Sequence, residues 1–295
     1  MRFGGAALGI AVAFVAGCGG EEPSPAPPDT LVRASEATKK LGGHHVEMDV
    51  RMRFEGLVRS QTYDIEASGV IDPGANRSEY RGDFSELTGE GSPYGEDSND
   101  ALVEVIERGP VLYVKMGALT EVFHEAGVDA TWLKEDRSKP LTARTRKVRE
   151  SIADIQEDPG EVLDYLDAAR GRVERLGRET IAGVETTRYR GATRLTELGV
   201  GKAPVIRRNV QANAREVMRS TGRRSVPVEA WIDRRGAVRR VVLDYRLRRN
   251  PANGRPIDGR LRIVANLSGF GRAVDPPPPP PDEVISLEEL VRLAE

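Results

Sequence analysis

The feature that most constrains the fold is a strict alternation of apolar and charged residues between Val46 and Phe54. Apolar side chains stand at positions 46, 48, 50, 52 and 54, and acidic or basic side chains stand between them. A period of two over such a length is typical of a β-strand with one apolar face and one solvated face. A sheet built from strands of this kind needs something to cover its apolar face.

The same alternation recurs along much of the chain. It predicts strands at 63–67, 76–84, 102–106, 111–116, 180–193, 226–232, 241–247 and 261–267. Apolar residues at helical spacing predict helices after Asp29, over 142–155, after Asp158-Pro159, over 200–221 and from Ser286. Residues 89–100 are predicted to be a loop, and residues 119–127 are ambiguous. About nine or ten mostly antiparallel strands, with helices over one face, make an α+β domain with a large curved sheet.

Composition excludes several classes of function. The 295 residues include 44 Lys and Arg against 46 Asp and Glu, and this balance does not favour nucleic-acid binding. The adjacent His44 and His45 would point to opposite faces of a strand, so they do not readily share a metal ion. The sequence contains no serine-hydrolase elbow, zinc-protease helix, phosphate loop or dinucleotide-binding turn. It therefore predicts no enzyme, no metal site and no cofactor.

The first eighteen residues have the character of an export signal. Arg2 precedes an apolar run that is shorter than the roughly 20 residues needed to cross a bilayer. The run ends at Val15-Ala16-Gly17-Cys18, which resembles the lipobox of bacterial lipoproteins and implies that Cys18 becomes the lipidated first residue. The alternative is an ordinary cleaved signal followed by a chance cysteine. A lipid on Cys18 would anchor the protein to the cell membrane, facing the extracytoplasmic space, without spanning the membrane.

The order of these features resembles the LppX/LprAFG group of actinobacterial lipoproteins, within the wider LolA/LolB-like superfamily. The first matching feature is the lipobox, with the tether and the amphipathic helix after it. The second is Asp158-Pro159 with Leu163 and Leu166, followed by Gly177-x-Glu179-x-Ile181-x-Gly183-Val184-x-Thr186. The third is the run Val226-Pro227-Val228-x-Ala230-Trp231-Ile232-Asp233-x-x-Gly236-x-Val238-Arg239. The resemblance extends over residues 30–275. It implies a half-barrel sheet whose concave, apolar face is closed by helices to form a cavity for lipids or acylated glycolipids.

With this resemblance the chain divides into four segments. They are a signal peptide ending in the lipobox (1–18), a proline-rich tether (19–30), a LolA/LppX-like lipid-binding domain (31–275), and a proline run with a short C-terminal helix (276–295). The expected partners are the membrane, through the anchor, and a lipid or glycolipid ligand, with no nucleic acid. The protein is expected to be a monomer, and the sequence names no protein partner.

Six residues are candidates for contact with the ligand. Met48 and Met52 would form an adaptable wall for acyl chains, although methionine in a strand also serves as simple core filler. Val50, Phe54, Leu243 and Tyr245 are expected to face inward with or without a ligand. Trp231 shares its face with Glu229 and Asp233, which places it away from the cavity.

Two basic stretches, at 144–149 and 202–224, have two interpretations. They either dock on anionic lipid headgroups or form solvated helix faces balanced by nearby acidic residues. Three functions compete for the whole chain: a lipid-binding or lipid-transfer lipoprotein, an envelope sensor or protein-interaction module without a lipid, and a hydrolase for which the sequence supplies no catalytic set.

Overall fold

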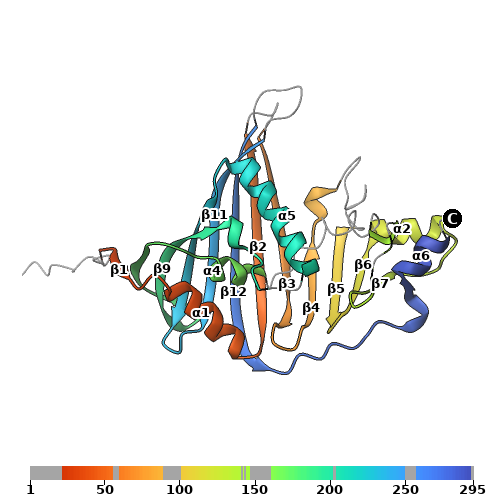
Figure 1. Ribbon diagram of the computed structural model, residues 1–295, viewed down its shortest axis with the longest axis horizontal. Helices are drawn as coiled ribbons and strands as arrows, with labels where there is room; N and C mark the ends of the chain where they lie inside the picture. The colour runs from red at the N-terminus through yellow and green to blue at the C-terminus, as the bar shows by residue number, and fades with distance from the viewer. Residues whose placement is uncertain are drawn as a thin grey trace, which may run out of the picture.

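One open sheet of thirteen strands extends along the molecule (Figure 1). The computed structural model describes residues 22–55, 60–88, 101–140, 142, 144–146, 161–201, 204–249 and 257–293. The strands are β1 (Ser24–Ala26), β2 (Gly43–Glu55), β3 (Gln61–Asp72), β4 (Arg77–Asp83), β5 (Leu102–Arg108), β6 (Val111–Met116), β7 (Trp132–Asp136), β8 (Val173–Ile181), β9 (Val184–Arg194), β10 (Ser225–Asp233), β11 (Val238–Arg249), β12 (Ile257–Arg272) and β13 (Val284–Ser286).

The strand order is β1-β8-β9-β10-β11-β12-β2-β3-β4-β5-β6-β7-β13. Every pairing is antiparallel except that of β13 with β7. The two halves of the chain meet where β12 pairs with β2, so the longest strands lie in the middle of the sheet. This order brings the candidate residues of β2 and β11 to either side of one strand, β12.

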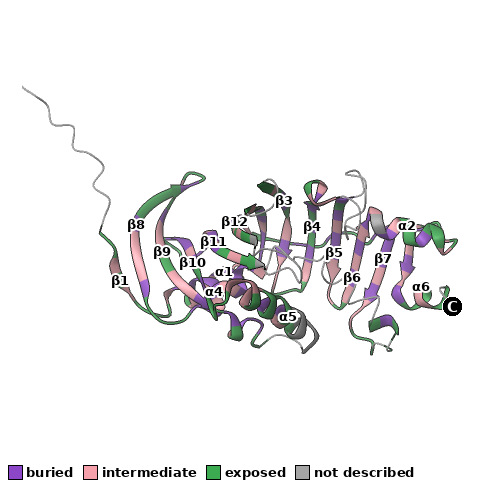
Figure 2. Ribbon diagram, turned by 90° about the horizontal axis from the view of Figure 1, so that it is seen from above, coloured by how far each residue is buried: buried purple, intermediate pink, exposed green. Residues whose placement is uncertain are grey.

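Helices gather on one face of the sheet, which is the concave face. Figure 2 shows α1 (Thr30–Lys40), α4 (Val162–Asp167) and α5 (Pro204–Thr221) on this side. Helix α1 packs against α4 and β11, α4 packs against β9, and α5 packs against β11. Helices α2 (Gly117–Glu125) and α6 (Leu287–Leu293) lie at the far end, beside β6, β7 and β13. The α+β prediction, a large curved antiparallel sheet with helices over its concave face, is confirmed.

Alternation in the sequence corresponds to alternation in burial. In β2, Val46, Met48 and Val50 are buried and the charged residues between them are exposed. In the described part of the chain, the short 3₁₀ turns η1 (Ser85–Leu87), η4 (Leu195–Glu197) and η5 (Pro281–Glu283) connect elements. The ambiguous segment at 119–127 is largely helix α2, and 131–133 opens strand β7. The predicted loop at 89–100 and most of the predicted helix at 142–155 lie outside the described residues.

Helix α6 begins as the sequence predicts. The Ser286 hydroxyl accepts a hydrogen bond from the backbone N–H of Glu289 at 3.1 Å, one half of a capping box. Leu287 and Leu290 are buried, with 2% and 5% of their surface exposed. Because β13 ends at Ser286, this capped helix and the last strand form one continuous C-terminal unit.

Both terminal segments join the sheet. Within the segment predicted as a tether, Ser24–Ala26 is extended, as its prolines favour, and pairs as β1 with β8. After β12, the chain follows the lower ends of the strands in Figure 1 until it reaches β7. Pro276 and Pro279 in this stretch are buried, which matches the three-residue repeat of a polyproline helix. Arg108 donates a hydrogen bond to the Pro276 carbonyl, and Arg77 pairs with Asp275.

Strands β3 and β4 approach each other closely at Gly69. A Cβ atom on Gly69 would lie 2.2 Å from the backbone oxygen of Glu79 and 2.5 Å from Cβ of Tyr80. Gly69 and Tyr80 stand opposite each other in β3 and β4, so the tyrosine occupies the space above the glycine. Tyr80 is thereby buried within the same continuous core as α1, α4 and the centre of the sheet.

Candidate functional site

The apolar residues of the concave face form cross-strand rows over β10, β11, β12, β2 and β3. In an antiparallel sheet, residues directly opposite one another point to the same face. Three rows follow from the pairing: Ala230–Val241–Ala265–Met48–Ala67, Val228–Leu243–Ile263–Val50–Ile65, and Tyr245–Leu261–Met52–Tyr63. A fourth pairs Leu247 with Gly259, Gly259 with Phe54 and Phe54 with Gln61. All six candidate residues therefore share one face.

Burial falls steadily from the first row to the fourth. Every residue of the Met48 row is buried, and Leu243 in the next row is 0% exposed. Leu261, Met52 and Tyr63 in the third row are half-buried, as are Leu247 and Phe54 in the fourth. We call these five residues, Met52, Phe54, Tyr63, Leu247 and Leu261, the half-buried band. The apolar face thus continues past the part of the sheet that the structure fully covers.

The six candidates fall into two groups. Met48, Val50, Leu243 and Tyr245 are buried in the continuous core, at 7%, 4%, 0% and 7% exposure. Met52 and Phe54 belong to the half-buried band, where the Phe54 and Tyr63 rings meet edge to face with their centroids 6.1 Å apart. Sequence reasoning did not select Tyr63, Leu247 and Leu261, although each lies in a predicted strand. These three residues are half-buried, and alternation does not report how deeply a residue of the apolar face is buried.

Helix α5 borders this part of the face. It packs against β11, the strand that carries Tyr245 and Leu247. Val217 and Met218 on α5 are half-buried and contact the core. Both side chains are apolar, so the helix adds to the apolar surroundings of the band.

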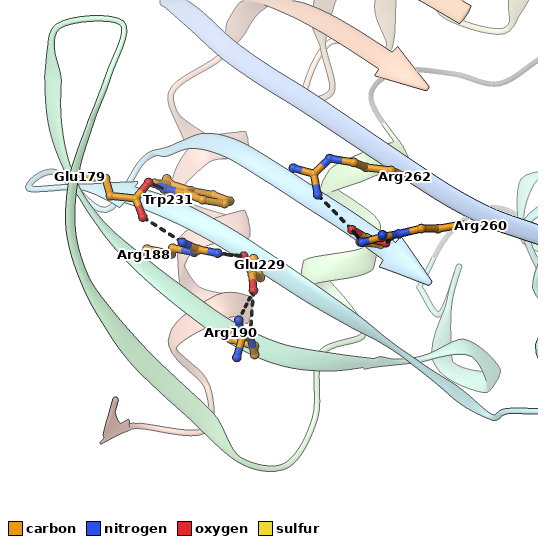
Figure 3. Close-up of polar contacts among 8 residues, drawn as sticks. Glu179, Arg188, Arg190, Glu229, Trp231, Arg260 and Arg262 are labelled. Carbon is orange, nitrogen blue, oxygen red and sulfur yellow. Dashed lines mark hydrogen bonds and ion pairs between the residues drawn. The ribbon is translucent and has the colours of Figure 1, made fainter. Parts of the chain in front are cut away.

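The opposite, outer face carries a network of charged residues around Trp231 (Figure 3). The Trp231 indole N–H donates a hydrogen bond to Glu179 at 2.8 Å, and the Arg188 guanidinium lies 4.9 Å from the ring centroid. Arg188 also pairs with Glu179 at 2.9 Å and with Glu229 at 2.6 Å. Trp231 therefore lies away from the concave face, as its alternation predicts, within a small cluster with Ile181, Val242 and Val264.

The ion pairs of the outer face keep its acids charged. Burial tends to raise the pKa of Glu179, but hydrogen bonds from Trp231 and Arg188 outweigh burial and hold that pKa below its usual value. Hydrogen bonds from Arg260, at 2.7 Å, likewise lower the pKa of Asp244, against the opposing effect of burial. Carboxylates stabilised in this way are poor general bases, so the network has the properties of a structural element.

The adjacent histidines point to opposite faces, as predicted. His44 is 1% exposed, and its ring lies 5.5 Å from that of Phe270. His45 is half-buried, with Nδ1 3.9 Å from Glu47. Among the described residues, no three His, Cys, Asp or Glu side chains gather as a set of metal ligands. A search of the same residues finds no helix long and apolar enough to cross a membrane.

Comparison with known proteins gives structural neighbours but no sequence relatives. No protein-family model matches the chain, and no curated protein matches its sequence. LprF from Mycobacterium bovis matches with a TM-score of 0.45 and 18% identity, over 87% of this chain and 99% of its own. The lipoprotein LppX from Mycobacterium tuberculosis matches with a TM-score of 0.40 and 15% identity, over 84% and 96%.

A LolA-superfamily protein from Nitrosomonas europaea matches with a TM-score of 0.27 and 13% identity, over 85% of this chain and 96% of its own. LprF and LppX carry the names of the group that the sequence resembles, and the third protein belongs to the wider superfamily. The chain is similar in fold to these three solved structures.

Proposed function

We propose that the protein is a lipid-anchored envelope lipoprotein that binds lipids or acylated glycolipids on its apolar concave face. The observation that carries this proposal is the half-buried band, an apolar surface that continues the core rows beyond full burial. Ligand sites are concave and mostly apolar, with few polar groups to fix orientation. An acyl chain lying along the band would pack against its apolar side chains and so continue the apolar contacts of the core.

The gain in free energy from such contact is large enough to hold a lipid. Each methylene removed from water contributes about 0.8 kcal/mol. Contact with six to eight methylenes would therefore offset the cost of association. Met52 suits this role because its unbranched thioether adapts to a mobile chain. The band offers few polar groups, so we expect selectivity for chain length and saturation to be loose.

The candidate residues would have different roles. Met48, Val50 and Leu243 would support the site from the packed core, and Tyr245 would stand at its border. Met52 and Phe54 would touch the ligand directly, together with Tyr63, Leu247 and Leu261. Transfer of the ligand between membranes or to an acceptor belongs to the proposal as a possible second step.

The proposed anchor keeps the domain close to its source of lipid. Cys18 lies four residues before Glu22, the first described residue, and four residues reach at most about 14 Å. A lipid on Cys18 would therefore hold β1 within a short distance of the extracytoplasmic membrane surface. Two or more acyl chains are needed for stable anchoring of this kind. A monomer suffices for this arrangement.

The experiment uses the chain that begins at Gly19, which contains every described residue and lacks the lipidated cysteine. Lipid extracted from the purified protein is identified by mass spectrometry, and uptake of a fluorescent fatty-acyl probe is titrated. Met52→Glu should weaken uptake by about tenfold or more, because the carboxylate would lose water without gaining a partner. Arg53→Glu places the same carboxylate on the next residue of β2, on the outer face, and should leave uptake unchanged.

Met52→Leu controls for folding, because it conserves volume and apolar character and should retain uptake. Repeated empty preparations, with no probe uptake by any variant, would contradict the proposal. A single dominant protein captured by crosslinking in cells would then favour the envelope sensor or interaction module.

A further inference from the structure

Helix α5 presents a basic face to solvent. Val210 and Ala214 are buried against the core, at 6% and 3% exposure. Arg207, Arg215 and Arg219 are exposed on the same helix, and the exposed Arg223 and Arg224 follow directly after its last residue. We call these five arginines the α5 basic face. They lie within a segment of eighteen residues, so the positive charge is concentrated in one short stretch of the chain.

Most of this charge has no counterpart within the described part of the protein. Arg219 pairs with Glu216 at 2.6 Å, and Glu216 is the one acidic residue in the sequence of α5. Among the described residues, Arg207, Arg215, Arg223 and Arg224 have no ion-pair partner. Within the described part of the segment, ion pairing with a nearby acid is therefore seen for Arg219 and not for the other four arginines.

The outer face of the sheet shows the contrast. There, Arg188 and Arg190 share Glu229, and Arg260 and Arg262 share Asp244. These four arginines are thus paired with carboxylates of the same face. The unpaired arginines of α5 keep their guanidinium groups available for an external anion, and a guanidinium binds phosphate in a two-pronged geometry.

An exposed apolar residue adjoins the basic face. Val200 is 68% exposed. It follows Gly199, where an added Cβ would lie 3.3 Å from Val210 and 3.4 Å from Cα of Arg207. The segment before α5 is therefore held against the helix beside Arg207. Basic residues next to an exposed apolar side chain are typical of surfaces that lie on a membrane.

We propose that the α5 basic face docks on a lipid bilayer that carries anionic headgroups. The argument rests on charge complementarity, because four unpaired arginines meet a surface rich in phosphate. The apolar side of α5 is already used within the protein, so docking is electrostatic and does not require the helix to insert. Each arginine at an anionic surface strengthens binding by a factor of about five, which corresponds to about 1 kcal/mol. This surface does not depend on whether the concave face binds a lipid.

The test measures binding of the chain from Gly19 to sedimenting vesicles. Vesicles of phosphatidylcholine alone are compared with vesicles of equimolar phosphatidylcholine and phosphatidylglycerol. At low salt we expect binding to the anionic vesicles alone, and weaker binding as salt screens the charges. The double variant Arg215→Gln with Arg223→Gln should bind the anionic vesicles about 25-fold more weakly.

The matched control is Arg178→Gln with Arg246→Gln. Both residues are exposed, and within the described part of the chain neither has an ion-pair partner, so the loss of charge is the same. The control pair should bind like the unaltered chain. Equal losses in both double variants would show that binding follows net charge alone and would overturn the proposal. Arg215→Lys with Arg223→Lys keeps the charge and should retain binding, which separates docking from folding.

A fluorescence measurement tests the orientation. Trp132 and Trp231 are buried, so the emission of Val200→Trp against that background reports on position 200. Its emission should shift to the blue with anionic vesicles and stay unchanged with phosphatidylcholine alone. Binding to anionic vesicles without that shift would mean that another surface docks, and would overturn the assignment to α5.

Discussion

A substitution of Leu243 tests whether the centre of the concave face is packed core, distinct from the half-buried band. This side chain is 0% exposed, and Val228, opposite it in β10, is 0% exposed as well. Leu243→Ala would leave a cavity that neighbouring strands cannot readily fill, because the rows on both sides are fixed by sheet pairing. Leucine-to-alanine substitutions cost about 2–5 kcal/mol, and complete burial places this one near 4 kcal/mol. The melting temperature should fall by about 10 °C in a domain of this size.

The assay is urea unfolding followed by the fluorescence of the two buried tryptophans. Leu293 supplies a matched control, because Leu293→Ala makes the same chemical change at a residue that is 46% exposed. The control should change the free energy of unfolding by less than about 0.5 kcal/mol. A loss below about 1 kcal/mol for Leu243→Ala would show that its side chain borders open space, and the division of the concave face into core and band would be wrong.

Three other substitutions test separate parts of the structure. Asp233→Asn should lower the free energy of unfolding by about 3 kcal/mol near neutral pH, because it leaves the half-buried Arg239 without its carboxylate, 2.8 Å away. Burial opposes ionisation of Asp233, but hydrogen bonds from Arg239 and two backbone N–H groups hold its pKa low, so this stabilisation is present above the ordinary carboxyl pKa. It is lost as the pH falls through the lowered pKa, and acid unfolding curves of the two proteins should converge there; a difference that persists would contradict the role of charge. Gly69→Ala should destabilise by more than about 2 kcal/mol, measured by urea unfolding, because its methyl group would overlap Tyr80 and the backbone of β4. Cys18→Ser should release the protein from membranes in cell fractionation while its circular dichroism stays unchanged, and a variant that still sediments with membranes would place the anchor elsewhere.

Strands with strict alternation were predictable because one local pattern, an apolar residue at every second position, specifies them. Met48 and Val50 alternate with acidic and basic residues, and the structure places them where that pattern requires. The turn after β10 also has a local cause. Asp233 accepts hydrogen bonds from the backbone of Arg235 and Ala237, as turn-forming aspartates do. Local chemistry determines these features, so a single sequence is enough to find them.

Strands that depend on a distant partner were not predictable. The predicted strand segment at 180–193 corresponds to β9, and nearly all of β8 (Val173–Ile181) was missed, because its irregular pairing with β9 around Gly177 hides the alternation. Strands β1 and β13 have three residues each, too few for a period to appear. Their existence follows from β8 and β7, which supply the hydrogen-bonding partners.

The sequence predicted which face of the sheet carries the candidate residues, but not how much of that face is left half-buried. Alternation identifies the face on which Met52 and Phe54 lie, and the structure confirms that they share it with Met48 and Leu243. It carries no information about where the helices stop covering that face. Which residues of that face stay half-buried depends on how helices and strands pack in the folded chain, where α5 packs against β11.

The two three-residue strands at the ends of the sheet have a consequence for association between molecules. An exposed edge invites pairing with another chain, and the long edges of β8 and β7 would offer such a template. Strand β1 covers the first, and Pro25 at its centre has no N–H to offer a further strand. Strand β13 covers the second, and the proline run before it and α6 after it leave no length for regular pairing. Both edges of this wide sheet are therefore covered by short strands of the same chain, which hinders pairing with a second copy.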